Sequence, residues 1–411
     1  MDESLKSRIR ENLITRRADQ FQFLSNLVKT PSELPPGNLS AVSNLTAKAL
    51  RGLGLGVERH AVPDELAAER GLGGITNLVV RHEFASGPVV ALSAYGDTGP
   101  RGEGWTVDPL GAEIQKGVLY GLGVISKADL ALYAYALAAL RDAHPDLSGT
   151  VELHFTFDGH ADGRLGPGWL LENGVVNPDY AVGSGFTYGI ATSAMGDLQL
   201  QVEIESEAPP PGTVATGPDA MEAASQVMSA LYQLRKKYAD IKSEVPGIGS
   251  PALVIGQIEG GNRPDQSPER VVFSLDRQLL PDENQDAVET ELTVLIARTA
   301  SSLKGIVCNI RRLNVSQPMK SGPGTDKLSG CLERQAAAVM GGPVWVYGVP
   351  YDANSRHYAA LGIPTVLYGA GPATREEARL GGPDERLILD DLRKATEVVA
   401  LALAEFLTPA A

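Results

Sequence analysis

The sequence has few cysteines, a deficit of basic residues and no long apolar run. Its 411 residues include only Cys308 and Cys331, too few for a disulfide framework and not spaced as a zinc site, so we expect a reducing compartment. The net charge of −14 disfavours nucleic acid or an anionic membrane as a partner, because both need a basic face. The charged N-terminal segment has no apolar signal core, and no run of about 18 apolar residues follows. We therefore expect a cytoplasmic protein without a membrane span.

Strands and helices alternate at both ends of the chain, which predicts an α/β sheet. The pattern changes after about residue 195, where 198–205 (LQLQVEIE) alternates with period two. The elements that follow have the order βαββαβ, which indicates a small two-layer domain that serves as a lid or dimerisation module. The prediction is an α/β domain made of residues 1–194 and 315–411, interrupted by an inserted domain at 195–314.

The stretch from Val89 to Leu140 carries two polar turns at the ends of buried elements. An apolar strand ends in Tyr95–Asp97, and a second turn leads through Ser126 into a long Ala/Leu-rich helix, which Ser126 is expected to cap. Loops that leave the ends of buried elements are a usual place for chemistry in α/β proteins. These two turns are therefore the first candidates for a functional site.

Between the turns lies Gly-Trp-x-x-Asp-Pro, at 104–109. With it, the stretch resembles the zinc-dependent aminoacylase and carboxypeptidase family, which includes acetylornithine deacetylase, succinyl-diaminopimelate desuccinylase and the glutamate carboxypeptidases. The resemblance continues at 166–174, 258–281 and 362–392 and covers nearly the whole chain. It implies a metal-binding α/β domain with an inserted dimerisation domain, a pair of zinc ions and a Glu as general base.

The resemblance places the family's metal ligands at five positions, and this chain keeps none of the original ligands. The replacements are Tyr95 for the first His, Ser126 for the bridging Asp, Gly159-His160 for the base and ligand Glu pair, Ser184 for an acidic ligand and Gly381 for the last His. Asp97 remains, but the His that it orients in the family is gone, so we expect it to have lost that role. We therefore predict no metal cofactor.

The inserted domain departs from the family as well. Pro209 stands where the resemblance places a His that reaches across the dimer to the substrate, Gln278 stands at an expected Arg, and Asp265 at an expected Asn.

Four residues remain candidates for metal-free acid–base chemistry: Tyr95, Asp97, Ser126 and His160. The family fold would bring them together in one cleft. Four others are candidates for substrate binding: Asp129, Ser184, Arg356 and His357. Arg356 would clamp a carboxylate, although a surface position is equally compatible with its helix, and Asp129 also reads as a surface carboxylate.

A rebuilt mononuclear metal site is a further alternative, with Asp158, His160 and Asp162 alternating along one turn and Asp129 nearby. A polar turn that binds no metal would contain the same residues. His60, His82 and His144 lie in ordinary strand and helix contexts and are expected to be structural.

Two functions from different classes stay open. The first is an enzyme that acts on a small amino-acid derivative or amide by altered, metal-independent chemistry. The second is a non-catalytic ligand-binding protein or a partner subunit of an active enzyme. An ordinary zinc amidohydrolase is a third reading. In each case we expect a small-molecule partner related to amino acids, and the inserted domain makes a homodimer the default.

Overall fold

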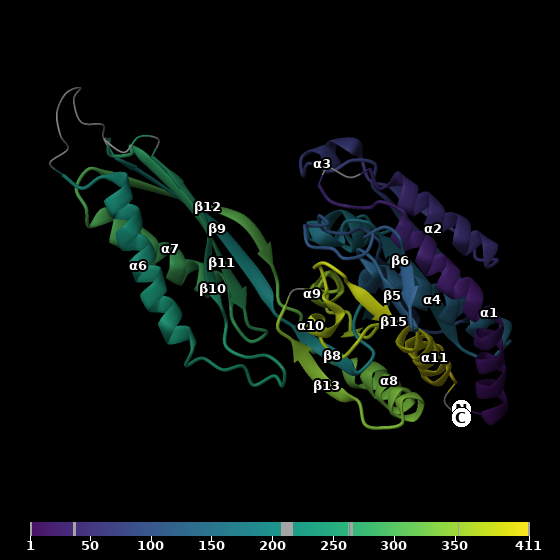
Figure 1. The fold of residues 1–411 in the computed structure, drawn as a ribbon. Coiled ribbons are helices and arrows are strands. Elements are labelled where there is room, and N and C mark those ends of the chain that lie inside the picture. Colours follow the sequence, from purple (N-terminus) through teal and green to yellow (C-terminus); the bar gives the residue numbers. More distant parts are fainter. Residues whose placement is uncertain are drawn as a thin grey trace. The chain divides into compact units, whose positions relative to one another are not determined.

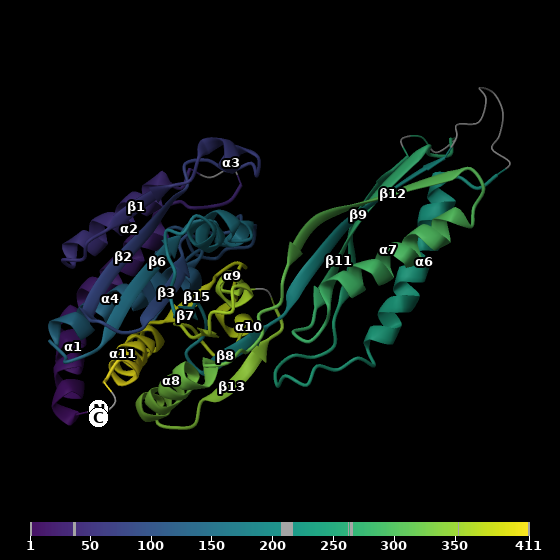
Figure 2. The same cartoon turned by 180° about the vertical axis from the view of Figure 1, so that it is seen from behind.

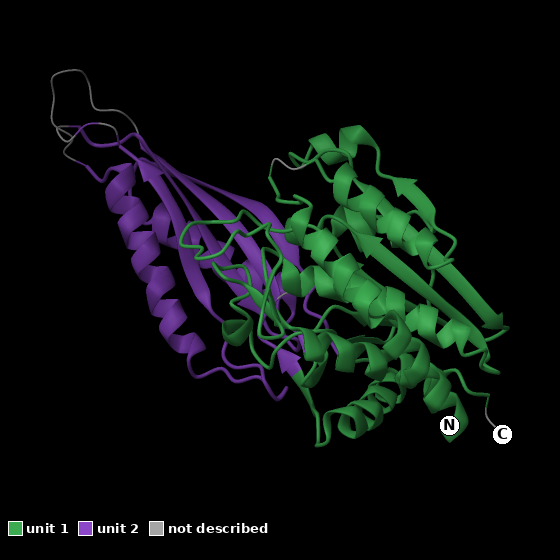
Figure 3. Ribbon diagram, turned by 45° about the vertical axis from the view of Figure 1, so that its right-hand side comes forward, with its two compact units in different colours: residues 1–192, 321–347, 354–411 green, residues 193–320, 348–353 purple. Residues whose placement is uncertain are grey.

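The computed structural model describes residues 2–35, 38–206, 217–261, 263, 266–351 and 353–409. The chain divides into two compact units (Figure 3): unit 1 comprises Met1–Thr192, Ser321–Tyr347 and Asn354–Ala411, and unit 2 comprises Ser193–Lys320 and Gly348–Ala353. Pro209 and Asp265 lie outside the described residues.

Unit 1 is built on a mixed sheet of eight strands in the order β1-β2-β6-β3-β7-β14-β8-β13 (Figure 1). The strands are β1 (Glu58–Ala61), β2 (Thr76–Ala85), β3 (Val89–Tyr95), β6 (Gly149–Thr156), β7 (Tyr180–Gly183), β8 (Gly189–Ala194), β13 (Trp345–Val349) and β14 (Thr365–Leu367). The central strands β6, β3, β7 and β14 run parallel. β3 is buried almost throughout, as its unbroken apolar run predicts for a parallel strand covered on both faces. The predicted α/β fold class is confirmed.

Helices surround this sheet. They are α1 (Glu3–Lys29), α2 (Ser40–Gly52), α3 (Asp64–Ala68), α4 (Val124–Asp142), α5 (Trp169–Glu172), α8 (Thr325–Met340), α9 (Arg356–Ala360), α10 (Arg375–Ala378) and α11 (Leu389–Phe406), with a short 3₁₀ turn at Gly159–Ala161 and a π turn at Arg164–Gly168. α4 is buried on every side, which explains its Ala/Leu-rich composition. The Gln20 amide donates to the carbonyl of Ala131 and the hydroxyl of Thr396, and so joins α1 to α4 and α11.

Unit 1 also contains a small three-stranded sheet that the sequence patterns did not predict. Its order is β15-β5-β4, with β4 (Glu113–Gln115), β5 (Val118–Tyr120) and β15 (Arg386–Ile388). Strands of three residues are too short for a period-two pattern to indicate them.

The expected cap of α4 is wrong. The helix begins at Val124 with Gly123 as its N-cap, in the left-handed region at φ +70°, and Ser126 lies inside the first turn. The two carboxylate oxygens of Glu385 accept hydrogen bonds from the N–H groups of Gly123 and Ile125, at 3.0 and 3.1 Å. A carboxylate from the far end of the chain therefore caps the helix, a role for which sequence spacing gives no signal.

Unit 2 has the predicted order βαββαβ. Its elements are β9 (Gly196–Ser206), α6 (Ala220–Tyr238), β10 (Leu253–Gly260), β11 (Arg270–Leu279), α7 (Gln285–Ser301) and β12 (Ile306–Ser316), and its antiparallel sheet has the order β10-β11-β9-β12. Both helices lie on one face of this sheet (Figures 1 and 2). Alternate residues of β9, from Leu198 to Ile204, are buried in the core with apolar residues of α6 and α7. The role of unit 2 as a lid or dimerisation module stays a prediction.

Arg277 on β11 points into this core rather than toward the face occupied by Gln278. Its guanidinium pairs with Glu283 at 2.6 Å and lies over the Tyr238 ring, 4.3 Å from the centroid. Among the described helices of both units, none is long and apolar enough to cross a membrane.

Candidate functional site

The candidate site forms where two neighbouring parallel strands end. Tyr95, the last residue of β3, lies in register with Thr156, the last residue of β6. The N–H of Gly96 donates to the Thr156 carbonyl at 3.0 Å and keeps the strand ends together. The turns that carry Asp97 and His160 therefore leave the sheet side by side, at the carboxyl edge where α/β proteins usually bind ligands.

Asp97 and His160 form a hydrogen-bonded pair at this edge. The Asp97 carboxylate is fully buried, and it accepts bonds from the backbone N–H of Gly159 and of His160, each at 2.7 Å. Nδ1 of His160 lies 3.0 Å from Asp97 Oδ2. Because an ionised carboxylate can only accept, Nδ1 is the nitrogen that donates to Asp97, and Nε2 is the other ring nitrogen. The His160 side chain is 37% exposed, so Nε2 is the nitrogen left for chemistry.

This pairing corrects the expectation that Asp97 lost its orienting role. The carboxylate still orients an imidazole, but the imidazole comes from the turn after β6 instead of from the end of β3.

The ring of Tyr95 lies against Gly159, the position at which the family resemblance implies a general base. A Cβ atom built on Gly159 would lie 2.2 Å from Cδ2 and 2.3 Å from Cγ of the Tyr95 ring. The ring also contacts His160 edge to face, with centroids 5.6 Å apart. The Tyr95 ring therefore leaves no room for a side chain at position 159 unless the ring moves.

The remaining replaced positions also do not fit a dinuclear zinc site. Ser126 Oγ donates to the Gly123 carbonyl at 3.2 Å and is nearly buried. Gly381 has no side chain that could coordinate a metal. Among the described residues, no group of three or more His, Cys, Asp or Glu side chains is arranged to hold a metal ion. We therefore derive no chemistry through zinc.

Asp129 is buried rather than on the surface, which corrects the sequence-based interpretation. It is 1% exposed, and its carboxylate accepts hydrogen bonds from the N–H groups of Ala370, at 2.7 Å, and Gly185, at 3.3 Å. Ser184 adjoins the same carboxylate. Asp129 thus joins the loops after β7 and β14, and Gly369 has to be glycine, because a Cβ there would lie 2.4 Å from an Asp129 oxygen.

The carboxylates of the mononuclear alternative bond other groups of the turn, although Oδ1 of Asp158 has no hydrogen-bond partner. One oxygen of the fully buried Asp158 accepts from the N–H groups of Leu165 and Gly166, at 2.7 and 2.8 Å. Burial, with the negative charge of Asp97 next in importance, raises the pKa of Asp158 to about 7. Asp162 pairs with Arg356. Asp158 and Asp162, which suggested a metal site, thus stabilise the turn after β6.

Arg356 is buried, so the alternative that placed it on the surface of its helix is wrong. Besides the ion pair, its guanidinium donates to the Asp162 carbonyl at 2.7 Å, and His357 Nε2 lies 3.0 Å from the same oxygen. Burial, followed by the charge of Arg356, lowers the pKa of His357 to about 4. Arg356 and His357 thus both hold the turn after β6 through Asp162.

The buried Asp129 carboxyl gives a testable pH dependence. Burial raises the pKa of Asp129 to about 8 from an unfolded value near 3.8. The folded state then binds more protons than the unfolded state between these values, so stability falls as pH rises through that window. We expect Asp129→Asn to remove about 1–3 kcal/mol of the decline in unfolding free energy between pH 5 and pH 8, measured by urea titration.

Asp390→Asn is the matched control, because Asp390 is exposed and Arg393 and its other partners lower the pKa of that carboxyl. It should leave the decline between pH 5 and pH 8 unchanged. An equal decline in wild type and Asp129→Asn would contradict the assignment.

Sequence reasoning missed three buried groups near the site. His154 bonds Tyr358 and Glu152, each at 2.8 Å, and so joins β6 to α9. Glu385 caps α4, and Lys127 is fully buried in the first turn of that helix. Only weak indications of these groups are present in the sequence. Glu385 follows Pro-Asp in a segment that resembles the family, and Lys127 is a charged residue inside an apolar helix.

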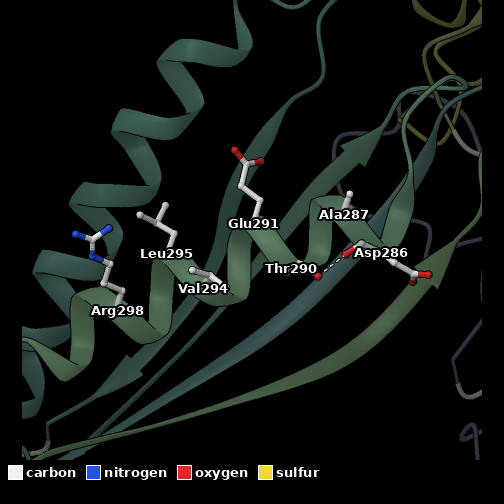
Figure 4. Close-up of a pocket in the computed structure, with 7 residues that line it drawn as sticks. All are labelled: Asp286, Ala287, Thr290, Glu291, Val294, Leu295 and Arg298. Atoms are coloured by element: carbon white, nitrogen blue, oxygen red, sulfur yellow. Dashed lines mark hydrogen bonds between the residues drawn. The ribbon is translucent and has the colours of Figure 1, made fainter.

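A hollow of about 670 Å³ lies along α7 in unit 2 (Figure 4). Its lining residues, from Asp286 to Arg298, all belong to that one helix and include none of the candidate residues.

Comparison with known proteins finds the same α/β fold. Residues 91–405 match the model of peptidase family M20/M25/M40, and the chain belongs to this family. Its scaffold is thus that of a hydrolase family.

Curated relatives match over shorter segments. Succinyl-diaminopimelate desuccinylase of Wolinella succinogenes is 38% identical over 101 residues, which cover 24% of this chain and 27% of that protein. The enzyme of the same name from Acidiphilium cryptum is 30% identical over 157 residues, 38% of each chain. The chain thus aligns with well under half the length of these relatives.

Solved structures match over the whole chain. The di-peptidase Dug1p from Saccharomyces cerevisiae has a TM-score of 0.76 at 14% identity, covering 98% of this chain and 99% of that one. Human carnosine dipeptidase 1 has a TM-score of 0.73 at 16% identity, covering 98% of each. At these identities the likeness establishes the fold alone.

Proposed function

We propose that this chain hydrolyses a small amino-acid derivative or amide without the zinc pair implied by the family resemblance, with His160 as general base. The observation that carries the proposal is the Asp97–His160 pair, with Nδ1 held 3.0 Å from a buried carboxylate and the ring partly exposed. An Asp that fixes the imidazole tautomer in this way is the arrangement that general-base histidines use.

In the proposed reaction, His160 Nε2 takes a proton from water while the water oxygen bonds to the amide carbonyl carbon. The proton passes to the leaving nitrogen as the C–N bond breaks, which returns His160 to its neutral form. The products are a carboxylic acid and an amine. Tyr95 is the donor proposed for the oxygen on which negative charge develops, and Ser126 borders the same turn.

Metal content separates this proposal from an ordinary zinc enzyme. Protein purified without chelator is expected to contain far less than one zinc ion per chain by elemental mass spectrometry, and any turnover should persist in EDTA. The physical reason is the donor set, since Gly159 and Gly381 offer no side-chain ligand. Two tightly bound zinc ions per chain, with activity lost on chelation, would overturn the proposal.

A second candidate is a non-catalytic ligand-binding protein or partner subunit. The Tyr95 ring against Gly159 favours it, because a glycine at 159 moves no proton. A panel of N-succinyl and N-acetyl amino acids and dipeptides separates the two candidates. Saturable hydrolysis supports the enzyme, whereas saturable binding of a panel member without turnover supports the binding protein.

We further propose a homodimer in a cytoplasmic setting, in line with the inserted βαββαβ unit and the two unpaired cysteines. Sedimentation of the purified chain tests the dimer.

A further inference from the structure

Helix α7 of unit 2 has one buried face and one exposed face. Leu292 and Ile296 on the buried face belong to the core under the sheet. The hollow on the exposed face is lined by side chains of α7 alone (Figure 4), and Val294, one of them, is 57% exposed. The hollow is thus open to an occupant from outside the chain.

Two opposite charges stand on this exposed face. Glu291 and Arg298 are both exposed and lie seven residues apart, about two helical turns, so they project from the same flank of α7 (Figure 4). The Arg298 side chain makes no hydrogen bond or ion pair with any residue that the structure describes. Glu291 accepts one long hydrogen bond, from the Tyr238 hydroxyl at 3.3 Å. Both charges therefore remain available to an outside partner.

This arrangement is self-complementary under a two-fold axis. When two copies of α7 pack antiparallel with the axis between Val294 and Leu295, Glu291 of one copy stands level with Arg298 of the other, because each lies about 5 Å along the helix from the axis. The reverse pair forms at the same time, and Val294 meets its own copy beside the axis. A two-fold contact of this kind closes on itself and yields a dimer.

The signs of these charges favour a second copy as the occupant. Each copy carries a net charge of −14, so two copies repel each other at long range. Two reciprocal ion pairs supply local attraction at the contact and fix its register. A partner of other chemistry would not require opposite charges placed symmetrically about an exposed valine.

We propose that the α7 face, meaning Glu291, Val294, Leu295 and Arg298, is the contact through which two copies of this chain form a homodimer. The inference rests on the homodimer put forward above and adds the surface that forms it. It involves neither His160 nor turnover, so its failure and a failure of the hydrolysis proposal are distinguishable.

The first test exchanges the two charges on the full chain and measures the dimer dissociation constant by sedimentation equilibrium at low salt. Arg298→Glu and Glu291→Arg each place like charges opposite each other at two symmetric positions, and we expect each to raise the constant about tenfold. Glu291→Arg/Arg298→Glu exchanges the signs, so it should return to within about threefold of wild type. Arg17→Glu, the same change at an exposed position of α1, should leave the constant unchanged.

A second pair of variants separates the two edges of unit 2. Val294→Glu puts a charge at the centre of the proposed contact, and we expect the dissociation constant to rise about 30-fold. Val254→Glu serves as its control, because Val254 is 50% exposed on the edge strand β10, whereas α7 pairs with the other edge strand, β12, through Glu289 and Arg312. Val254→Glu should dimerise like wild type. Thermal melts should show an intact fold in both variants, since both valines are exposed.

Three results would overturn this surface while leaving the homodimer in place. They are single charge variants that dimerise like wild type, a double charge variant weaker than either single variant, and loss of the dimer in Val254→Glu but not in Val294→Glu. A wild type that stays monomeric at about 100 μM would overturn the homodimer together with its surface.

Discussion

His160→Asn is expected to lower kcat for any hydrolysed panel substrate by about 10²–10⁴-fold, the usual contribution of a general base. Asn has neither the pKa nor the second ring nitrogen needed to take a proton from water. Because the His160 ring is partly exposed, the midpoint of thermal unfolding should change little. Steady-state kinetics and a thermal melt on the same preparation measure both effects.

The matched control is His60→Asn, which replaces an imidazole that is paired with Glu58 on β1, the edge strand, which β2 separates from β6. It should leave kcat and KM unchanged. Full activity in His160→Asn would remove His160 as the base and direct attention to Tyr95.

Gly159→Ala is expected to lower the unfolding free energy by about 1–3 kcal/mol, the range for overpacking a filled site. The new Cβ would lie 2.2 Å from the Tyr95 ring, so the ring has to leave its position over the turn. Gly159→Glu introduces the residue that the resemblance implies as the general base. It should lower the unfolding free energy further and should not create a zinc enzyme. Urea unfolding of the variants measures these effects.

Two comparisons sharpen this test. Gly56→Ala is the control, because no atom lies within 4 Å of its new Cβ, and we expect a change within about 0.5 kcal/mol. Tyr95→Ala opens the space above Gly159, so Gly159→Ala should cost much less in that background. Additive costs for Gly159→Ala and Tyr95→Ala would mean that the ring does not limit the space at position 159.

Several features of this protein follow from the sequence alone. The alternation of apolar runs with helical periods sets the order of strands and helices, and the period-two pattern of β9 predicts the two-layer unit, because both patterns are local. The sequence also shows directly that glycines stand at 159 and 381, where the resemblance implies the base and the last His, and no fold gives a glycine a coordinating side chain. The buried character of α4 follows from its composition.

Only the tertiary structure decided how the remaining groups pair. Asp97 and His160 lie 63 residues apart and meet because β3 and β6 are neighbours in the sheet, an order that local patterns do not encode. Glu385 caps α4 from 262 residues away along the chain. Asp129 was interpreted as a surface carboxylate because a polar residue one turn into a helix usually faces water.

No sequence pattern indicates the burial of Lys127 either, because its Nζ bonds the carbonyl of Thr30 at the end of α1, a separate element. Charge compensation depends on the distances among groups from separate elements, and those distances exist only once the sheet and its helices have packed.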